Sequence, residues 1–228
     1  RYADPTLESI QAQAGDDVCA VMVELIQGEG GLRPLEVSMV QSLAALCREK
    51  DWLLLVDEVQ TGVGRTGSLF AFQQYGVLPD VVSFAKGIAG GLPMAGVMCS
   101  EKCRNVLGPG THATTFGGNP IAAAGANVVL DELDDAMLAE VNQKGEYLKS
   151  AIAAFDSPYV DTVRGMGLMI GIVLKEGVDR SALVKALYDH NLLVLTAGQN
   201  VIRLLPPLLI SQDEMDKGLA IMKDVLCS

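Results

Sequence analysis

The chain has 228 residues, half of them hydrophobic, and can therefore bury a substantial core in one large domain or two smaller ones. Its formal net charge of −11 argues against binding to nucleic acid, because no basic stripe is present to neutralise phosphates. No apolar stretch approaches the length of a membrane span, and the first residues lack the order of a signal peptide.

The cysteines and histidines argue against further classes of site. The five cysteines are scattered and contain no CxxC pair, so we expect reduced thiols in a cytoplasm rather than a disulfide scaffold or a zinc site. Two histidines leave little material for a metal site or a Ser-His-Asp triad. Because the chain opens with Arg1 and no methionine, we expect it to be a piece of a longer polypeptide.

In residues 1–134, apolar runs alternate with segments of helical periodicity, which predicts a parallel α/β sheet. Each run is continuous and aliphatic, as expected of a strand that is covered on both faces. The predicted strands are 18–23, 52–57 and 81–84, and the predicted helices are 36–49, 71–75 and 121–133.

The character of the sequence changes near Asp134, and we predict a smaller α+β domain after it. A long amphipathic helix comes first, with Val141, Gly145 and Leu148 on one face. The last helix begins with a capping box that starts at Ser211. Between these helices we predict strands at 159–163, 168–173, 192–195 and 201–204, and a helix at 179–189.

Reactive residues follow the three apolar runs of the predicted sheet: Glu24, Asp57 and Lys86. Ligands of open α/β sheets sit at the carboxyl ends of the strands, so these side chains are expected along one edge. An amine near an acid in a partly dry pocket favours covalent carbonyl chemistry, because burial lowers the pKa of a lysine and frees its lone pair. Lys86 is therefore a candidate for a Schiff base, and Asp57 could keep a heterocyclic nitrogen protonated.

The segment 62–67 matches the dinucleotide-binding pattern G-x-G-x-x-G. That pattern requires its first glycine directly after a strand, and an acid about twenty residues further on. Here residues 57–61 separate the segment from the apolar run, and the acid is missing. We therefore interpret 62–67 as a tight loop that uses the backbone freedom of glycine.

Two other features each allow two interpretations from the residues alone. Arg203 lies between apolar stretches, and a buried guanidinium needs an acid such as Glu29. The pair is either a structural salt bridge, or Glu29 is a removable partner that frees the arginine for a substrate carboxylate. The segment 114–120 offers hydroxyl and backbone N–H groups to a phosphate, or is an ordinary Gly/Pro turn.

Taken in order, four stretches resemble successive motifs of the class III pyridoxal-phosphate aminotransferases: 24–31, 55–67, 83–87 and 114–120. The resemblance continues through 200–207 and covers nearly the whole chain. It is nearest to the acetylornithine branch of arginine biosynthesis, although the ornithine, succinylornithine and 4-aminobutyrate branches share most of these motifs. The resemblance implies fold type I of the PLP-dependent transferases, with 1–134 in the large cofactor-binding domain and 135–228 as the small C-terminal domain.

The resemblance implies roles for ten residues. Lys86 would be the catalytic residue that binds pyridoxal 5′-phosphate, and the other expected cofactor contacts are Asp57, Glu58, Val59, Gln60 and Thr115. Substrate contacts are expected from Thr114, Glu29, Arg203 and Glu24. The implied ping-pong reaction transfers the δ-amino group of N-acetylornithine to 2-oxoglutarate, giving N-acetylglutamate semialdehyde and glutamate.

The resemblance also implies a homodimer, in which Thr115 contacts the cofactor phosphate across the interface. Members of the family have an N-terminal region that has no counterpart here, and a sheet without its strands should expose apolar edges. Two rival expectations follow. One is a truncated, non-catalytic chain, and the other is a nicotinamide oxidoreductase that binds its cofactor at 62–67.

Overall fold

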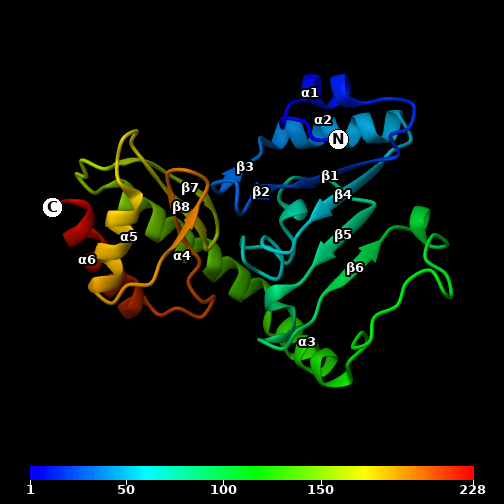
Figure 1. Cartoon of the computed structure of the whole chain (residues 1–228). Helices are drawn as coiled ribbons and strands as arrows, with labels where there is room; N and C mark the ends of the chain where they lie inside the picture. The colour runs from blue at the N-terminus through cyan, green and yellow to red at the C-terminus, as the bar shows by residue number, and fades with distance from the viewer. The chain divides into compact units, whose positions relative to one another are not determined.

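The computed structural model describes residues 1–228 and divides into two compact units (Figure 1). The first unit comprises Arg1–Leu25, Leu35–Val63 and Ser68–Asp134. The second unit comprises Ile26–Pro34, Gly64–Gly67 and Asp135–Ser228. Two short segments from the first half of the sequence therefore belong to the second unit. None of the helices is both long enough and apolar enough to span a membrane.

A four-stranded sheet in the order β1-β4-β5-β6 forms the centre of the first unit. Its first three strands, β1 (Ala20–Glu24), β4 (Leu53–Asp57) and β5 (Val81–Phe84), are parallel neighbours, so the predicted α/β sheet is confirmed. β6 (Gly96–Cys99) pairs antiparallel with β5. β6 is not among the predicted strands, because its short apolar run directly follows a Gly/Pro-rich loop and contains a glycine.

One face of the sheet is covered by α2 (Val37–Glu49), with α1 (Leu7–Gln13) beside it (Figure 1). The buried side of α2 includes Val40 and Cys47, whereas Val37 at its first turn is 46% exposed. Burial raises the pKa of the Cys47 thiol to about 11, so this thiol remains protonated at neutral pH.

The helix α3 (Pro120–Glu132) begins at Asn119, whose Oδ1 accepts hydrogen bonds from the first N–H groups of the helix. It packs closely on η2 (Lys86–Ala89), since a Cβ at Gly125 would lie 3.1 Å from the Ala89 carbonyl oxygen. α3 therefore supports the single turn that carries Lys86. The other short 3₁₀ segments are η1 (Ala71–Gln73) and η3 (Glu101–Cys103).

The two edges of this sheet present apolar side chains, as the sequence led us to expect. β1 and β6 have a neighbour on one side only, and Met22 on β1 and Val97 on β6 are 61% and 62% exposed. Exposed edge strands with apolar side chains are sites where further chain can pair or pack.

An antiparallel sheet in the order β7-β8-β10-β9 forms the centre of the second unit. Its strands are β7 (Val160–Met166), β8 (Met169–Leu174), β9 (Leu195–Ala197) and β10 (Val201–Leu204), and a small separate pair joins β2 (Ile26–Gln27) to β3 (Arg33–Pro34).

The strand predicted at 192–195 begins later than expected, at Leu195. The N–H of Leu192 instead donates to the carbonyl of Leu187 and closes the preceding helix, after Asn191 has adopted the left-handed region at φ 63°. The periodicity alone does not distinguish such a helix end from the start of a strand.

Three helices, α4 (Asp135–Ala153), α5 (Arg180–Asp189) and α6 (Gln212–Leu226), pack against this sheet. The predicted capping box of α6 is confirmed, because the Ser211 hydroxyl accepts from the Glu214 N–H while the Glu214 carboxylate accepts from the Ser211 N–H. The most deeply buried core side chains are Val141, Ile152, Leu168, Ile170, Ile172, Leu187, Ile202 and Leu226.

α4 approaches the turn between β7 and β8 through a glycine. A Cβ at Gly145 would lie 2.1 Å from the carbonyl oxygen of Gly167, far inside any real contact. The helix can lie this close to the turn because Gly145 has no side chain. Gly218, in the middle of α6, differs, since its Cβ would meet only Leu192 Cδ1 at 3.8 Å.

These two helical glycines form a matched pair for a stability test. Gly145→Ala should lower the free energy of unfolding of the second unit by about 2–3 kcal/mol, because the helix must move away from Gly167. Gly218→Ala should raise it by about 0.5–1 kcal/mol through helix propensity. Urea unfolding followed by circular dichroism measures both, with the fluorescence of Trp52, in the first unit, as internal reference. Equal midpoints for the two variants would contradict the close contact.

Candidate functional site

The register of the parallel strands brings three polar residues into one row in the first unit. Glu24 at the end of β1 is paired with Asp57 at the end of β4, and Asp57 is paired with Ser83 on β5. Residues in register on neighbouring strands point to the same side of a sheet. The row therefore presents two carboxylates and a hydroxyl on one face at the carboxyl edge of the sheet, where ligands of α/β sheets bind.

Asp57 and Ser83 differ in how their polar atoms are used. Asp57 is half-buried, and its Oδ1 accepts a hydrogen bond of 2.9 Å from the Val59 N–H. The Ser83 hydroxyl oxygen is buried and has no hydrogen-bond partner in this structure. A buried hydroxyl without a partner is costly, so it marks a place where a polar ligand group would be stabilising. The sequence analysis did not assign Ser83 a role, because a serine in an apolar strand carries no signal of its own.

Lys86 follows β5 and opens η2 in an uncommon backbone conformation. Its φ is 53°, in the left-handed region that a residue with a side chain seldom adopts, and such outliers gather at functional sites. The side chain is exposed and takes part in no ion pair or hydrogen bond of the chain. The described side chains of the first unit do not cover this amine, and the expected partly dry pocket stays a prediction.

Glu58 lies beside Asp57 in the sequence but faces the interior. Its side chain is completely buried, and its two oxygens accept hydrogen bonds from the Thr61 hydroxyl and, at 2.8 Å, from the Phe72 N–H. Burial raises the pKa of the Glu58 carboxyl, and these hydrogen bonds oppose that shift. The expectation of direct cofactor contact by this carboxylate needs correction, because the strand-to-turn geometry directs it into the protein.

The remaining expected cofactor contacts, and Thr114 as an expected substrate contact, lie in turns and connecting segments. Val59 and Gln60 are half-buried in the turn that follows β4. Thr114 and Thr115 are exposed on the segment that precedes α3. Thr114 lies close to Gly117, where a Cβ would approach the threonine methyl group to 2.3 Å, so the backbone folds tightly at this point.

The glycine-rich segment 62–67 does not have the geometry of a dinucleotide-binding loop. The whole segment is turn, and no helix begins at Gly67; the next helical residues are those of η1, starting at Ala71. Gly64 and Gly67 adopt φ values of 81° and 83°, which supports the interpretation as a tight loop that needs glycine. Without a helix N-terminus after the last glycine, the pyrophosphate site of that motif is absent.

In the second unit, Arg203 and Glu29 form an ion pair. Arg203 on β10 is buried, and its Nη1 donates to Glu29 Oε1 at 2.7 Å and to the Gly28 carbonyl at 2.9 Å. The Glu29 side chain is 72% exposed. Its backbone is held, since the Glu29 carbonyl accepts from the Gly198 N–H. The pair thus joins a buried guanidinium to a carboxylate that is largely exposed to solvent.

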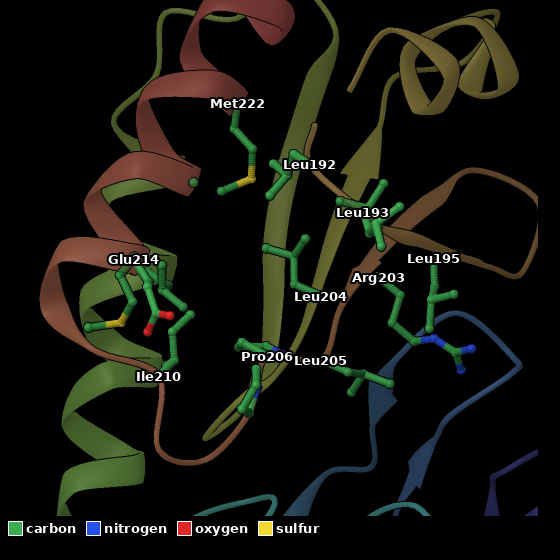
Figure 2. A pocket seen from close by; sticks show the side chains of 15 residues that line it. Leu192, Leu193, Leu195, Arg203, Leu204, Leu205, Pro206, Ile210, Glu214 and Met222 are labelled. Atoms are coloured by element: carbon green, nitrogen blue, oxygen red, sulfur yellow. The ribbon is translucent and has the colours of Figure 1, made fainter. Parts of the chain in front are cut away.

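A cavity of about 370 Å³ lies in the second unit beside β10 and α6. Figure 2 shows Leu192, Leu204 and Met222 gathered there, whereas the Arg203 side chain extends away from them. Neighbouring residues of a strand point to opposite sides, which explains this separation. The cavity is lined mainly by apolar side chains, with Arg203 and Glu214 as its two charged residues, so it does not have the character of a catalytic site.

The chain resembles known proteins over nearly its whole length. The sequence profile described as "Aminotransferase class-III" matches residues 2–226. An acetylornithine aminotransferase of Streptococcus mutans is 45% identical over 96% of this chain and 58% of its own length. One of Haemophilus ducreyi is 41% identical over 93% of this chain and 53% of its own length.

Solved structures agree with these relatives. The N-acetylornithine aminotransferase of Stenotrophomonas maltophilia matches with a TM-score of 0.88 at 36% identity, covering 97% of this chain and 60% of that one. The ornithine aminotransferase of Plasmodium yoelii matches with a TM-score of 0.89 at 32% identity, covering 97% and 60%. The chain thus spans little more than half of the relatives that it matches. Since a family profile covers nearly all of its residues, the chain belongs to the class III aminotransferases.

Proposed function

We propose that this chain carries the cofactor-lysine part of an enzyme that transfers the δ-amino group of N2-acetylornithine to 2-oxoglutarate. The products would be N-acetylglutamate 5-semialdehyde and glutamate, as in arginine biosynthesis. The observation that carries the proposal is the row of Glu24, Asp57 and Ser83 next to the exposed amine of Lys86. The curated relatives named acetylornithine aminotransferase, at 40–45% identity, support this amino donor.

The residues of the first unit fit pyridoxal 5′-phosphate. Lys86 offers an unpaired amine to an aldehyde, and Asp57 offers a carboxylate to a ring nitrogen. The buried Ser83 hydroxyl, which lacks a partner within the chain, fits a polar group bound at the same edge. When bound, the cofactor acts as an electron sink that makes the proton on the amine-bearing carbon of the substrate acidic.

The chain's own groups would then position the substrate and move its proton. Lys86 Nζ is the proposed general base that removes the proton from the amine-bearing carbon and returns one later in the cycle. Val59 would pack against the ring, Gln60 would approach its hydroxyl oxygen, and Thr114 would lie beside the substrate. Glu24, at the end of β1, would contribute a second carboxylate close to Asp57.

Glu29 and Arg203 are the proposed switch of the second unit. Arg203 would bind the side-chain carboxylate of 2-oxoglutarate after Glu29 has turned away, and Glu29 would neutralise Arg203 while the amine substrate is bound. The exposure of Glu29 supports this role, because a carboxylate in solvent can leave its partner at low cost. The hydrogen bond that Arg203 donates to the Gly28 carbonyl would help keep the guanidinium in place meanwhile.

We further propose a homodimer in the cytoplasm. Residues 104–121 are exposed throughout, which leaves Thr115 accessible to the phosphate of a cofactor bound by a second copy. All five cysteines are free, which supports a reducing compartment. Ornithine is the alternative amino donor, favoured by the likeness to the ornithine aminotransferase structure.

Cofactor binding by Lys86 provides the first test. Pyridoxal phosphate is added to the purified chain, the mixture is reduced with borohydride, and mass spectrometry identifies the modified lysine. The cofactor should be fixed on Lys86, and its binding should disappear in Lys86→Ala. Lys102→Ala is the control, because Lys102 is another lysine of the same unit, paired on the surface with Asp51. Equal labelling of both variants would contradict the assignment of Lys86.

The switch pair predicts opposite effects of two conservative substitutions. Glu29→Gln should strengthen the binding of 2-oxoglutarate about tenfold, corresponding to about 1.4 kcal/mol, because Arg203 loses its competing carboxylate. Arg203→Lys should weaken it, because an ammonium group lacks the planar fork of guanidinium. Isothermal titration measures both affinities, and the same series with N-acetylornithine and ornithine separates the two amino donors. Unchanged affinity in both variants would show that the pair is only structural.

A further inference from the structure

Glu58 is a buried carboxylate that braces the turn between β4 and η1. Its Oε1 accepts from the Phe72 N–H at 2.8 Å, and its Oε2 accepts from the Thr61 hydroxyl, which is itself 1% exposed. Its carbonyl oxygen accepts from the Gly62 N–H at 2.9 Å. The carboxylate thus joins both ends of the turn 58–72 without reaching the surface.

The turn leaves no room for this brace to relax. A Cβ at Gly62 would lie 2.8 Å from the Glu58 carbonyl oxygen and 2.9 Å from the ring of Phe70. Phe70 stacks on Phe72, with ring centroids 5.9 Å apart, and is tilted against Phe84 of β5 at 6.0 Å. The Glu58 side chain is completely buried, so each hydrogen bond of its carboxylate matters more than it would in solvent.

The turn that Glu58 braces contacts both β5, which leads to Lys86, and η2, which begins with Lys86. The Glu58 N–H donates to the Ser83 carbonyl at 2.9 Å, which fixes the end of β4 against β5. Five residues after Glu58, Val63 packs on η2, since a Cβ at Gly87 would lie 3.7 Å from the Val63 Cγ1. Gly87 is the residue directly after Lys86.

Val63 is also held against its backbone preference. Its φ is 57°, and a β-branched residue in the left-handed region is a true outlier that surrounding structure must maintain. Lys86, which directly precedes the Gly87 that Val63 contacts, has φ 53°. Two strained residues therefore lie on either side of one packing contact, and the fixed turn that begins at Glu58 maintains the first of them.

We propose that Glu58 is a positioning residue, whose buried carboxylate acts through Thr61 and the Phe72 backbone to hold Asp57 and Lys86 in their places. This inference rests on the proposed function for its catalytic meaning, because that function assigns the work to Asp57 and Lys86. The Glu58 side chain is completely buried, so we assign it no contact of its own with cofactor or substrate. Its burial and its raised pKa, to which the neighbouring Asp57 adds, agree with a carboxyl group that is kept inside the fold for its geometry.

Hydrogen–deuterium exchange of the cofactor-free chain tests the brace directly. Glu58→Ala should increase exchange at least tenfold in 58–63 and also in 84–88, while α2 and the second unit remain protected. Thr61→Val should reproduce the pattern, and Thr61→Ser, which keeps the hydroxyl, should not. Tyr75→Phe is the control, because Tyr75 is similarly buried in the same unit and its hydroxyl hydrogen-bonds the Leu25 carbonyl, at 3.1 Å, and the Leu35 backbone.

The affinity of Lys86 for pyridoxal phosphate provides a second measurement. This affinity should stay unchanged if Glu58 contributes only to the overall stability of the fold. Glu58→Ala should lower the apparent affinity of Lys86 for pyridoxal phosphate about tenfold or more at a temperature where circular dichroism is unchanged. Glu58→Gln, which keeps the shape and an acceptor for the Phe72 N–H, should restore it.

Two results would overturn the positioning role: unchanged exchange at 84–88 in Glu58→Ala, or equal effects of Glu58→Ala and Tyr75→Phe on cofactor affinity. If the unsubstituted chain captures no cofactor although Glu58→Ala loosens 84–88, the brace is supported and the proposed function fails. The two hypotheses are thereby distinguished.

Discussion

The register of three parallel strands is the constraint on which the candidate site depends. Asp57 stands opposite Glu24 on one side and opposite Ser83 on the other. Within β4 the buried residues Leu54 and Val56 alternate with half-buried ones, so a slip of one residue would turn Asp57 toward the face covered by α2. The hydrophobic pattern of the strand thus decides where a carboxylate is presented, before any ligand contributes.

Much of this arrangement follows from the sequence, because its causes are local. Continuous aliphatic runs give the parallel strands, and a change of composition near Asp134 coincides with the end of one segment of the first unit. The capping box at Ser211 is a complete local signal and is found where expected. The class III motifs add residue roles that no periodicity contains.

What the sequence does not provide depends on contacts between distant segments. Segments 26–34 and 64–67 join the second unit through partners more than a hundred residues away, for example the Arg164 side chain donating to the Gly31 carbonyl. The burial of the Glu58 side chain cannot be predicted from the motif either, because Glu58 is adjacent to Asp57 in the sequence. Adjacent residues at the end of a strand point to opposite sides, and only the fold decides which of them faces the ligand.

The left-handed backbone conformation of Lys86 is unfavourable for a residue that has a side chain. A glycine at this position would carry no strain, and the fold would gain roughly 1 kcal/mol from the exchange. A lysine is found there instead, exposed and without a partner that could offset the cost. If Lys86 has the proposed role, position 86 is a trade-off between stability and activity within a single residue, of the kind expected where selection maintains chemistry at the expense of the fold. A stabilisation programme guided by backbone conformation alone would choose this lysine among its first replacements, and would remove the one amine on which the proposed reaction depends.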